Sequence, residues 1–212
     1  MSFRRKIKAY TTVPLSHQLV SDVLSDYQRP NDKINELVKS GDLVSLRRGL
    51  YIPGPELDLP VPENFLIANH LRGPSYVSLD SALSYWGMIP ERVYEICSVT
   101  TKTTKTYQTP IGRFSFQHLP LPYYAFGLTR IELRPQQFAM MATREKAVCD
   151  KIILTSGILL RSVQQTRTFL MEDLRIDEGE LQKLNPTIIH SWLEDAPKKE
   201  SLNMLLKTIE RI

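Results

Sequence analysis

The stretch KSGDLVSLRRGLYIP, residues 39–53, decides how the first part of this chain folds. Two short runs of residues that favour strands, Leu43–Leu46 and Leu50–Ile52, flank the tripeptide Arg47-Arg48-Gly49. A short break that contains glycine, placed between two such runs, is typical of a tight hairpin turn. The sequence therefore predicts a β-hairpin whose tip carries two neighbouring cations.

Two helices are predicted immediately before this hairpin. Ser16 can cap the first, because its side chain can accept a hydrogen bond from the first turn, and apolar residues recur at helical spacing as far as Leu24. Pro30 suits the first turn of the second helix, where its missing N–H is not needed, and Gly41 suits its end. A helix, a turn, a second helix and a hairpin follow one another in a winged helix-turn-helix, so we predict that fold for residues 1–58.

Positive charge is concentrated in the same part of the chain. The whole sequence has 27 basic and 23 acidic residues, a net charge of +4. Residues 1–55 hold nine basic and five acidic residues, whereas residues 56–212 hold 18 of each. The entire excess therefore lies in the first quarter, which points to a polyanionic partner for that segment.

We expect this segment to bind double-stranded DNA. Polar side chains on the second helix would read base edges in the major groove, while cations of the hairpin and of the N-terminus would meet phosphates or enter a minor groove. A protein-docking module with a basic loop is the alternative interpretation. The predicted DNA-binding residues are Arg4, Arg5, Lys6, Arg29, Asn31, Lys33, Asn35, Lys39, Arg47 and Arg48.

A second domain is predicted over residues 59–212. The segment PELDLPVPE, residues 55–63, contains three prolines and three acidic residues without helical or strand periodicity, so it is interpreted as a linker. The fold class predicted for the whole chain is α+β: a winged helix-turn-helix, then a mixed α+β domain with a C-terminal helical part.

Within the second domain, helices and strands are predicted to alternate before the helical part begins near Thr143. A hairpin turn is predicted at residues 110–112. Ser78 is predicted to cap the helix that begins at residue 79. The expected helices cover residues 64–71, 79–86, 143–153, 162–174, 178–184, 186–194 and 198–211. The expected strands outside that hairpin cover residues 93–100, 123–126, 130–133 and 138–142.

Several classes of protein are disfavoured by the sequence. No stretch approaches the roughly 18 consecutive apolar residues of a membrane span, and no apolar signal core follows the basic N-terminus, so we expect a cytoplasmic protein. Cys97 and Cys149 are isolated and the four histidines are scattered, and no nucleotide-binding or hydrolase motif is present. We therefore expect no metal site, no cofactor and no catalytic residue.

The most enzyme-like stretch is TREKAVCDK, residues 143–151. Glu145, Lys146 and Asp150 could form a nuclease-type cluster of acids and a lysine. On a helix, however, Lys146 and Asp150 share one face as an ordinary ion pair, and Glu145 suits the first turn. We favour this structural interpretation and keep a nucleic-acid-processing enzyme as an alternative.

Three stretches together resemble the AbiEi-type antitoxins of type IV toxin–antitoxin and phage-defence systems. The first, residues 39–51, includes RRGLY; the second is YVSLDSALSYWG, residues 76–87; the third is TREKAVCD, residues 143–150. Their order and spacing are similar to those of the family from about residue 15 to about residue 155, some two thirds of the chain. The helices predicted after that point match no motif of the family.

The resemblance implies an antitoxin. Its first domain would bind inverted repeats upstream of its own operon and repress it. Its second domain would counteract a toxin of the nucleotidyltransferase fold without a stable toxin–antitoxin complex. Repressors that read inverted repeats commonly bind as two copies, although no dimer helix is evident in this sequence. A winged-helix regulator whose second domain senses a ligand or partner is the alternative.

Overall fold

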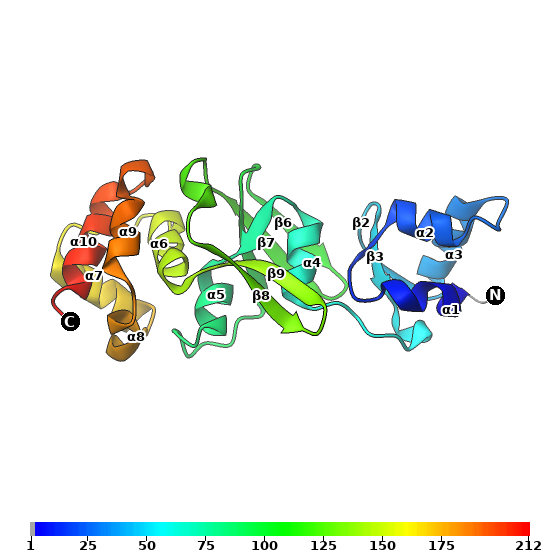
Figure 1. Ribbon diagram of the computed structural model, residues 1–212, viewed down its shortest axis with the longest axis horizontal. Coiled ribbons are helices and arrows are strands. Elements are labelled where there is room, and N and C mark those ends of the chain that lie inside the picture. The colour runs from blue at the N-terminus through cyan, green and yellow to red at the C-terminus, as the bar shows by residue number, and fades with distance from the viewer. Residues whose placement is uncertain (1–2) are drawn as a thin grey trace.

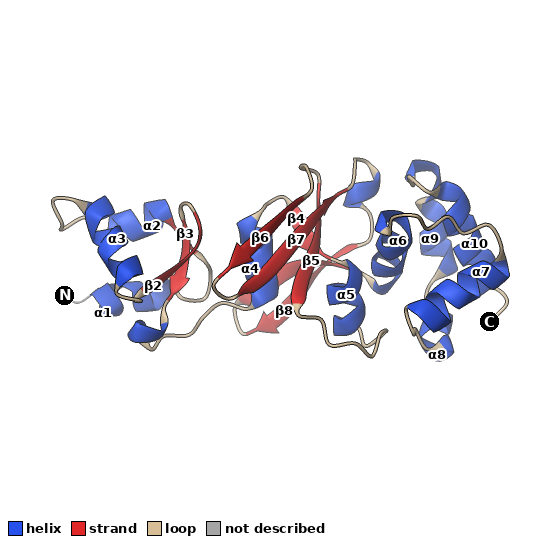
Figure 2. Cartoon of the chain, turned by 180° about the vertical axis from the view of Figure 1, so that it is seen from behind, coloured by secondary structure: helices blue, strands red, loops and turns tan. Residues whose placement is uncertain are grey.

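The computed structural model describes residues 3–212, which form an elongated molecule of mixed α and β structure (Figure 1). A small group of helices with a three-stranded sheet lies at one end of the long axis, a six-stranded sheet lies in the middle, and a group of short helices lies at the other end (Figures 1 and 2). The two ends of the chain therefore lie far apart. No helix in the described part of the chain has the length and apolar character that a membrane crossing requires.

The first part of the chain contains the helices α1 (Phe3–Ile7), α2 (His17–Val23) and α3 (Pro30–Lys39). The Ser16 hydroxyl accepts a hydrogen bond from the backbone N–H of Leu19 at 3.2 Å, so the predicted cap of α2 is confirmed. Gly41 follows α3 with a φ of +83°, the left-handed conformation expected at the end of that helix. The three helices enclose a small core that includes Ile7, Val20, Leu24, Ile34 and Leu37.

The predicted hairpin is present as β2 (Leu43–Arg47) and β3 (Leu50–Pro53). A two-residue strand β1 (Leu15–Ser16) pairs with β3, which gives the order β1-β3-β2. Leu43 and Tyr51 belong to the core of the first part, whereas Leu46, Leu50 and Ile52 belong to the large core of the rest of the chain. The hairpin is therefore held by both cores at once.

The six-stranded sheet has the order β6-β7-β5-β4-β9-β8. Its strands are β4 (Ser75–Val77), β5 (Glu95–Thr100), β6 (Lys105–Thr109), β7 (Gly112–His118), β8 (Leu128–Arg134) and β9 (Gln137–Ala142). Two pairs, β4 with β9 and β5 with β7, are parallel, and the remaining pairs are antiparallel. The helix α4 (Asn64–Leu71) packs on β4 and β9, and α5 (Leu79–Tyr85) packs on β5 and on α6 (Arg144–Leu154).

The C-terminal helices are the ones that the sequence predicts, although most are shorter. They are α7 (Val163–Arg167), which continues as a π-helical turn over Thr168–Asp173, α8 (Glu178–Gln182), α9 (Pro186–Ser191) and α10 (Lys199–Ile209). The apolar face of α10 joins the same large core as the sheet, through residues that include Leu202 and Leu205. The sheet and the C-terminal helices thus share one core.

Two local predictions are wrong. Ser78 precedes α5 but makes no capping bond, because its hydroxyl donates instead to the Asp150 carboxylate at 2.8 Å. The stretch predicted as a strand over residues 123–126 is a 3₁₀-helix, Tyr123–Ala125. Its two tyrosines are both buried, and in a strand successive side chains would have pointed to opposite faces.

Gly54 leaves no space for a side chain where the hairpin ends. A Cβ at this position would lie 1.9 Å from the carbonyl oxygen of Gly41. Gly54→Ala would have to push the end of β3 away from the end of α3, so we expect the free energy of unfolding to fall by about 3 kcal/mol in urea titrations. Gly87→Ala is the control, because a Cβ there meets nothing within 4 Å and only its φ of +69° opposes the change, by about 1 kcal/mol. An equal fall in the free energy of unfolding of both variants would show that a side chain at residue 54 is not more crowded than one at residue 87.

Candidate nucleic-acid interface

A groove of about 440 Å³ runs between α3 and the tip of the hairpin. Amides from α3, an imidazole from α2 and a guanidinium from the hairpin face it. No carboxylate is among its lining residues, which are His17, Asn31, Ile34, Asn35, Arg48, Gly49 and Tyr51. Amides carry both a donor and an acceptor, and a guanidinium suits phosphate, so the groove offers the chemistry that base edges and a nucleic-acid backbone require.

The two amides of the groove come from one face of α3. Asn31 and Asn35 are four residues apart and exposed, whereas Leu37 is buried on the far side of the helix and the buried Ile34 lies beside the amides in the groove wall. The Asn31 Oδ1 lies 2.9 Å from the Nε2 of His17, the first residue of α2. The amphipathic pattern of the helix therefore places both amides where the sequence predicts them.

The two arginines of the hairpin point in different directions. Arg48 lines the groove. The guanidinium of Arg47 instead donates from Nε to the carbonyl of Leu71 at the end of α4, at 2.9 Å, and from Nη1 to the carbonyl of Arg48 at 3.2 Å. Arg47 is the last residue of β2, whereas Arg48 lies in the turn that follows, so the two side chains leave the hairpin from different backbone settings. Arg47 ties the hairpin to the end of α4.

The remaining basic residues of the prediction lie outside the groove. Lys6 pairs with Asp26 and also donates to a backbone carbonyl, and Arg4 pairs with Asp58 at 3.2 Å. Arg4 and Arg5 line a separate pocket with Lys8. These contacts tie the N-terminal helix to α2 and to the segment after the hairpin, and the residues concerned are not brought to the face that carries the amides.

A third group of charges lies around the start of α3. Arg29 lies 3.8 Å from Asp32, and the Lys33 ammonium donates to Glu36 at 2.7 Å, a hydrogen bond that raises the pKa of Lys33. These residues line a different pocket from Asn31 and Asn35. Lys39 is exposed in the last turn. Of the ten predicted residues, the structure thus gathers Asn31, Asn35 and Arg48 in one groove.

His17 is the groove residue with a titratable polar side chain facing the amides that the sequence does not predict. A single histidine carries no motif, and the only available signal is its position directly after the cap residue Ser16. Its backbone N–H donates to the carbonyl of Gly49 at 2.9 Å, so the fold draws the start of α2 to the hairpin turn. Contacts between these segments cannot be deduced from local spacing.

Lys146 and Asp150 form the expected helix ion pair, and the pair is fully buried. The Lys146 ammonium lies 3.0 Å from Asp150 Oδ1 and donates to the carbonyl of Tyr123 at 2.9 Å. The other carboxylate oxygen accepts hydrogen bonds from Tyr76 and Ser78 at 2.9 and 2.8 Å. Burial raises the pKa of Asp150 and lowers that of Lys146, and the attraction between the two charges opposes both shifts.

The three residues of the enzyme alternative do not meet in an open site. Asp150 and Lys146 have no exposed surface, whereas Glu145 points elsewhere and accepts a hydrogen bond from the backbone of Asn185 at 3.2 Å. Within residues 3–212, no three His, Cys, Asp or Glu side chains gather as a metal site requires. A substrate could therefore reach Asp150 only if the core opened.

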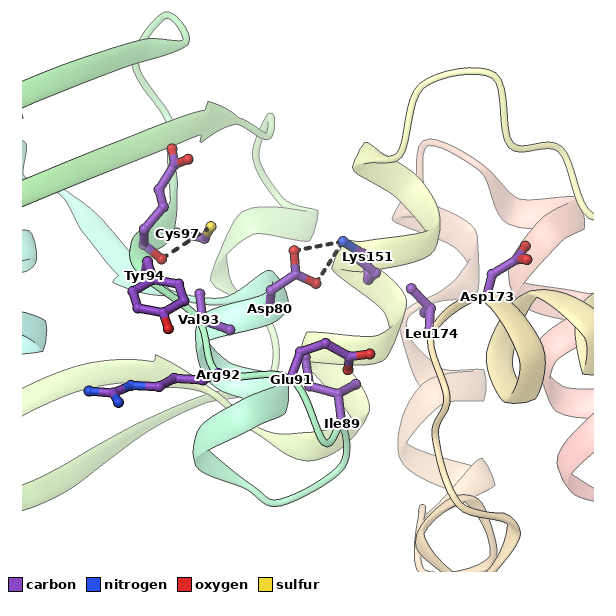
Figure 3. A pocket seen from close by; sticks show the side chains of 11 residues that line it. Asp80, Ile89, Glu91, Arg92, Val93, Tyr94, Cys97, Lys151, Asp173 and Leu174 are labelled. Atoms are coloured by element: carbon purple, nitrogen blue, oxygen red, sulfur yellow. Dashed lines mark hydrogen bonds and ion pairs between the residues drawn. The ribbon is translucent and has the colours of Figure 1, made fainter.

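The second domain also has a surface cleft of about 420 Å³ between the sheet and the C-terminal helices (Figure 3). Lys151 pairs with Asp80 on its wall, at 2.6 Å, and the Cys97 thiol lies nearby, with a pKa that burial raises (Figure 3). Two other acids of the wall, Glu91 and Glu95, pair with arginines. The cleft is polar: three of its acids pair with Lys151 or with arginines outside the lining, and Arg92 and Asp173 line it as well.

The buried ion pair generates a stability prediction. Lys146→Met leaves the Asp150 carboxylate buried without its counter-charge, so we expect the free energy of unfolding to fall by about 3–5 kcal/mol in urea titrations. Lys199→Met is the matched control, because Lys199 pairs with Glu194 on the surface and such pairs contribute about 0–1 kcal/mol. A similar small fall in the free energy of unfolding of both variants would show that the buried pair does not stabilise the fold.

The chain matches no protein-family model and no curated protein. Its fold is similar to that in the crystal structure of the RV2827C protein from Mycobacterium tuberculosis, with a TM-score of 0.64 and 13% sequence identity. That similarity covers 97% of this chain and 75% of the other. At such low identity the two proteins share a fold, and the fold is all that this comparison establishes.

Proposed function

We propose that this chain is a DNA-binding autorepressor whose first part acts as a winged helix-turn-helix. In this proposal α2 and α3 are the two helices of the motif, and the β2–β3 hairpin is the wing. The observation that carries the proposal is the groove in which Asn31, Asn35 and Arg48 lie together on an exposed face without a carboxylate. The basic excess of the first quarter of the sequence supports it as well.

The geometry suggests how DNA would bind. With α3 in the major groove, Asn31 and Asn35 would face base edges, and an asparagine amide can pair with adenine through two hydrogen bonds. Arg48 at the hairpin tip would then meet the phosphate backbone beside that groove. Arg47 would have a different role, because its hydrogen bond to Leu71 fixes the hairpin on the second domain. Two copies of the chain would cover an inverted repeat.

The antitoxin activity of the second domain is the second half of the proposal. It is supported by the resemblance of residues 76–87 and 143–150 to the AbiEi-type antitoxins. These two stretches meet in the folded chain, where Tyr76 and Ser78 from the first donate to Asp150 from the second. We propose that the domain built on them counteracts a nucleotidyltransferase-like toxin without a stable complex and without catalytic chemistry of its own.

A regulator whose second domain senses a small ligand is the second candidate, and the cleft beside Asp80 and Lys151 is the observation that favours it. A growth assay distinguishes the two. Cells that express the toxin encoded beside this chain should recover when this chain is co-expressed, if it is an antitoxin. Failure to rescue growth at equal expression would favour the ligand-sensing regulator.

Fluorescence anisotropy tests the DNA-binding proposal directly. We expect the protein to bind DNA from upstream of its own gene more tightly than scrambled DNA, and both affinities to fall as salt rises, because bound phosphates release counterions. The measurement uses both DNAs at two salt concentrations. Equal affinity for the two sequences at both salts would contradict sequence-specific repression.

Two substitutions separate the expected roles of the groove residues. Arg48→Ala should weaken binding to both DNAs and reduce the slope of log affinity against log salt by about 0.9, the contribution of one phosphate contact. Asn35→Ala should instead reduce the preference for upstream DNA, by about 1–3 kcal/mol. Arg211→Ala, an exposed arginine near the other end of the chain, is the control and should leave both quantities unchanged. The assignment fails if Arg48→Ala binds like the parent at every salt.

A further inference from the structure

The guanidinium of Arg47 joins the turn of the hairpin to the end of α4. We infer that Arg47 is a positioning residue of the proposed DNA groove: the N–H group at its Nε, rather than its charge, holds the turn where Arg48 meets phosphate. This inference rests on the proposed DNA-binding function. It makes the end of α4, which lies outside the helices and hairpin of the groove, a determinant of how tightly the groove binds DNA.

Two hydrogen bonds define the connection. The Arg47 Nε donates to the carbonyl of Leu71, the last residue of α4, at 2.9 Å, and the Nη1 donates to the carbonyl of Arg48 at 3.2 Å. Arg48 lies in the turn and lines the groove. One side chain is thus bonded to the backbone of the residue that would meet phosphate and to a helix that ends 24 residues further along the chain.

The end of α4 suits a cationic donor. The last carbonyls of a helix have no partner within the helix and carry partial negative charge, so a guanidinium is favourable beside them. The side chain of Leu71 is buried in the large core, which holds this end of α4 in place. Arg47 therefore has its hydrogen-bond partners on α4 and in the turn, and it is not among the residues that line the groove.

The backbone that follows α4 is itself held by the six-stranded sheet. The Lys102 ammonium, from the segment between β5 and β6, donates to the carbonyl of Gly73. The hydroxyl of Thr100, the last residue of β5, donates to the carbonyl of Pro74 at 2.7 Å. Because these bonds fix the end of α4 to the sheet, the bond from Arg47 fixes the turn of the hairpin relative to the sheet as well.

Three roles of Arg47 lead to different effects on DNA binding. If its charge meets phosphate directly, any neutral residue should lower both the affinity and its dependence on salt. If Arg47 only stabilises the fold, a substitution should reduce the fraction of folded protein and leave the salt dependence unchanged. If Arg47 positions Arg48, loss of the Nε donor should displace the turn, and the phosphate contact of Arg48 should be lost with it.

Glutamine and methionine at position 47 separate the donor from the charge. Both side chains are neutral and similar in length. At the place of the arginine Nε, glutamine carries an amide nitrogen that donates, whereas methionine carries a methyl carbon. Arg47→Gln can therefore keep the hydrogen bond to the Leu71 carbonyl, and Arg47→Met cannot.

Anisotropy with upstream DNA over a range of salt concentrations measures the affinity and its salt slope. We expect Arg47→Met to bind about fivefold more weakly than the parent, the effect of one lost hydrogen bond. Its slope of log affinity against log salt should fall by about 0.9, the contribution of the phosphate contact of Arg48. Arg47→Gln should keep the parent slope and lie within about twofold of the parent affinity. Arg211→Met, which removes an exposed charge near the other end of the chain, is the control and should match the parent in both.

A double-mutant cycle tests whether Arg47 acts through Arg48. In the Arg48→Ala background, Arg47→Met should cause no further fall in affinity or in slope, because the contact that the turn positions is already lost. Two independent phosphate contacts would instead lower the slope of the double variant by about 1.8. Urea titrations of each variant establish that the fold is retained.

The outcomes for the two variants at position 47 separate this inference from the proposed function. Equal falls in affinity and slope for Arg47→Gln and Arg47→Met would show that Arg47 meets phosphate through its charge. An unchanged slope for Arg47→Met would show that Arg47 does not position Arg48. Either result overturns the inference, and the proposed repressor stands as long as the parent prefers upstream DNA. If the parent has no such preference, the repressor and the inference fall together.

Discussion

The buried ion pair between Lys146 and Asp150 is the interaction around which β4, α6 and the turn at Tyr123 meet. Removing two charges from water is costly, and the pair is tolerated because its atoms have partners on three segments that are distant in sequence: β4, α6 and the turn at Tyr123. Gly127 closes the same site, because a Cβ there would lie 2.8 Å from the Cβ of Lys146 and 2.6 Å from the ring of Trp192. The ion pair is thus enclosed where the sheet, α6 and, through Trp192, the C-terminal helices meet.

The hairpin connects the first part of the chain to the large core that surrounds this ion pair. Its apolar residues are divided between the small core of α1 to α3 and the large core, and Arg47 adds a hydrogen bond to the end of α4. The groove that we propose for DNA is thus built partly on a strand pair that the second domain holds in place. A change in the packing beneath the hairpin would alter the position of Arg48 relative to α3.

Local signals explain which parts of this arrangement could be predicted from the sequence. The cap at Ser16, the proline that begins α3, the glycine after it and the alternation of the hairpin act within a few residues, and each appears where the sequence places it. Ser78 and Arg47 differ from expectation because their partners, Asp150 and Leu71, are 72 and 24 residues away. The role of His17 in the groove depends on the same kind of long-range contact, so no spacing rule could have revealed it.

The elongated shape keeps the two ends of the molecule apart, so that partners at the two ends would not meet. The groove lies in the part of the molecule at one end of its long axis, and the C-terminal helices lie at the other end, with the six-stranded sheet between them (Figure 1). A duplex bound at the first end, as we propose, would leave the far helices open to solvent. If the groove binds DNA as we propose, the six-stranded sheet would stand between the duplex and any partner of the C-terminal helices (Figure 1).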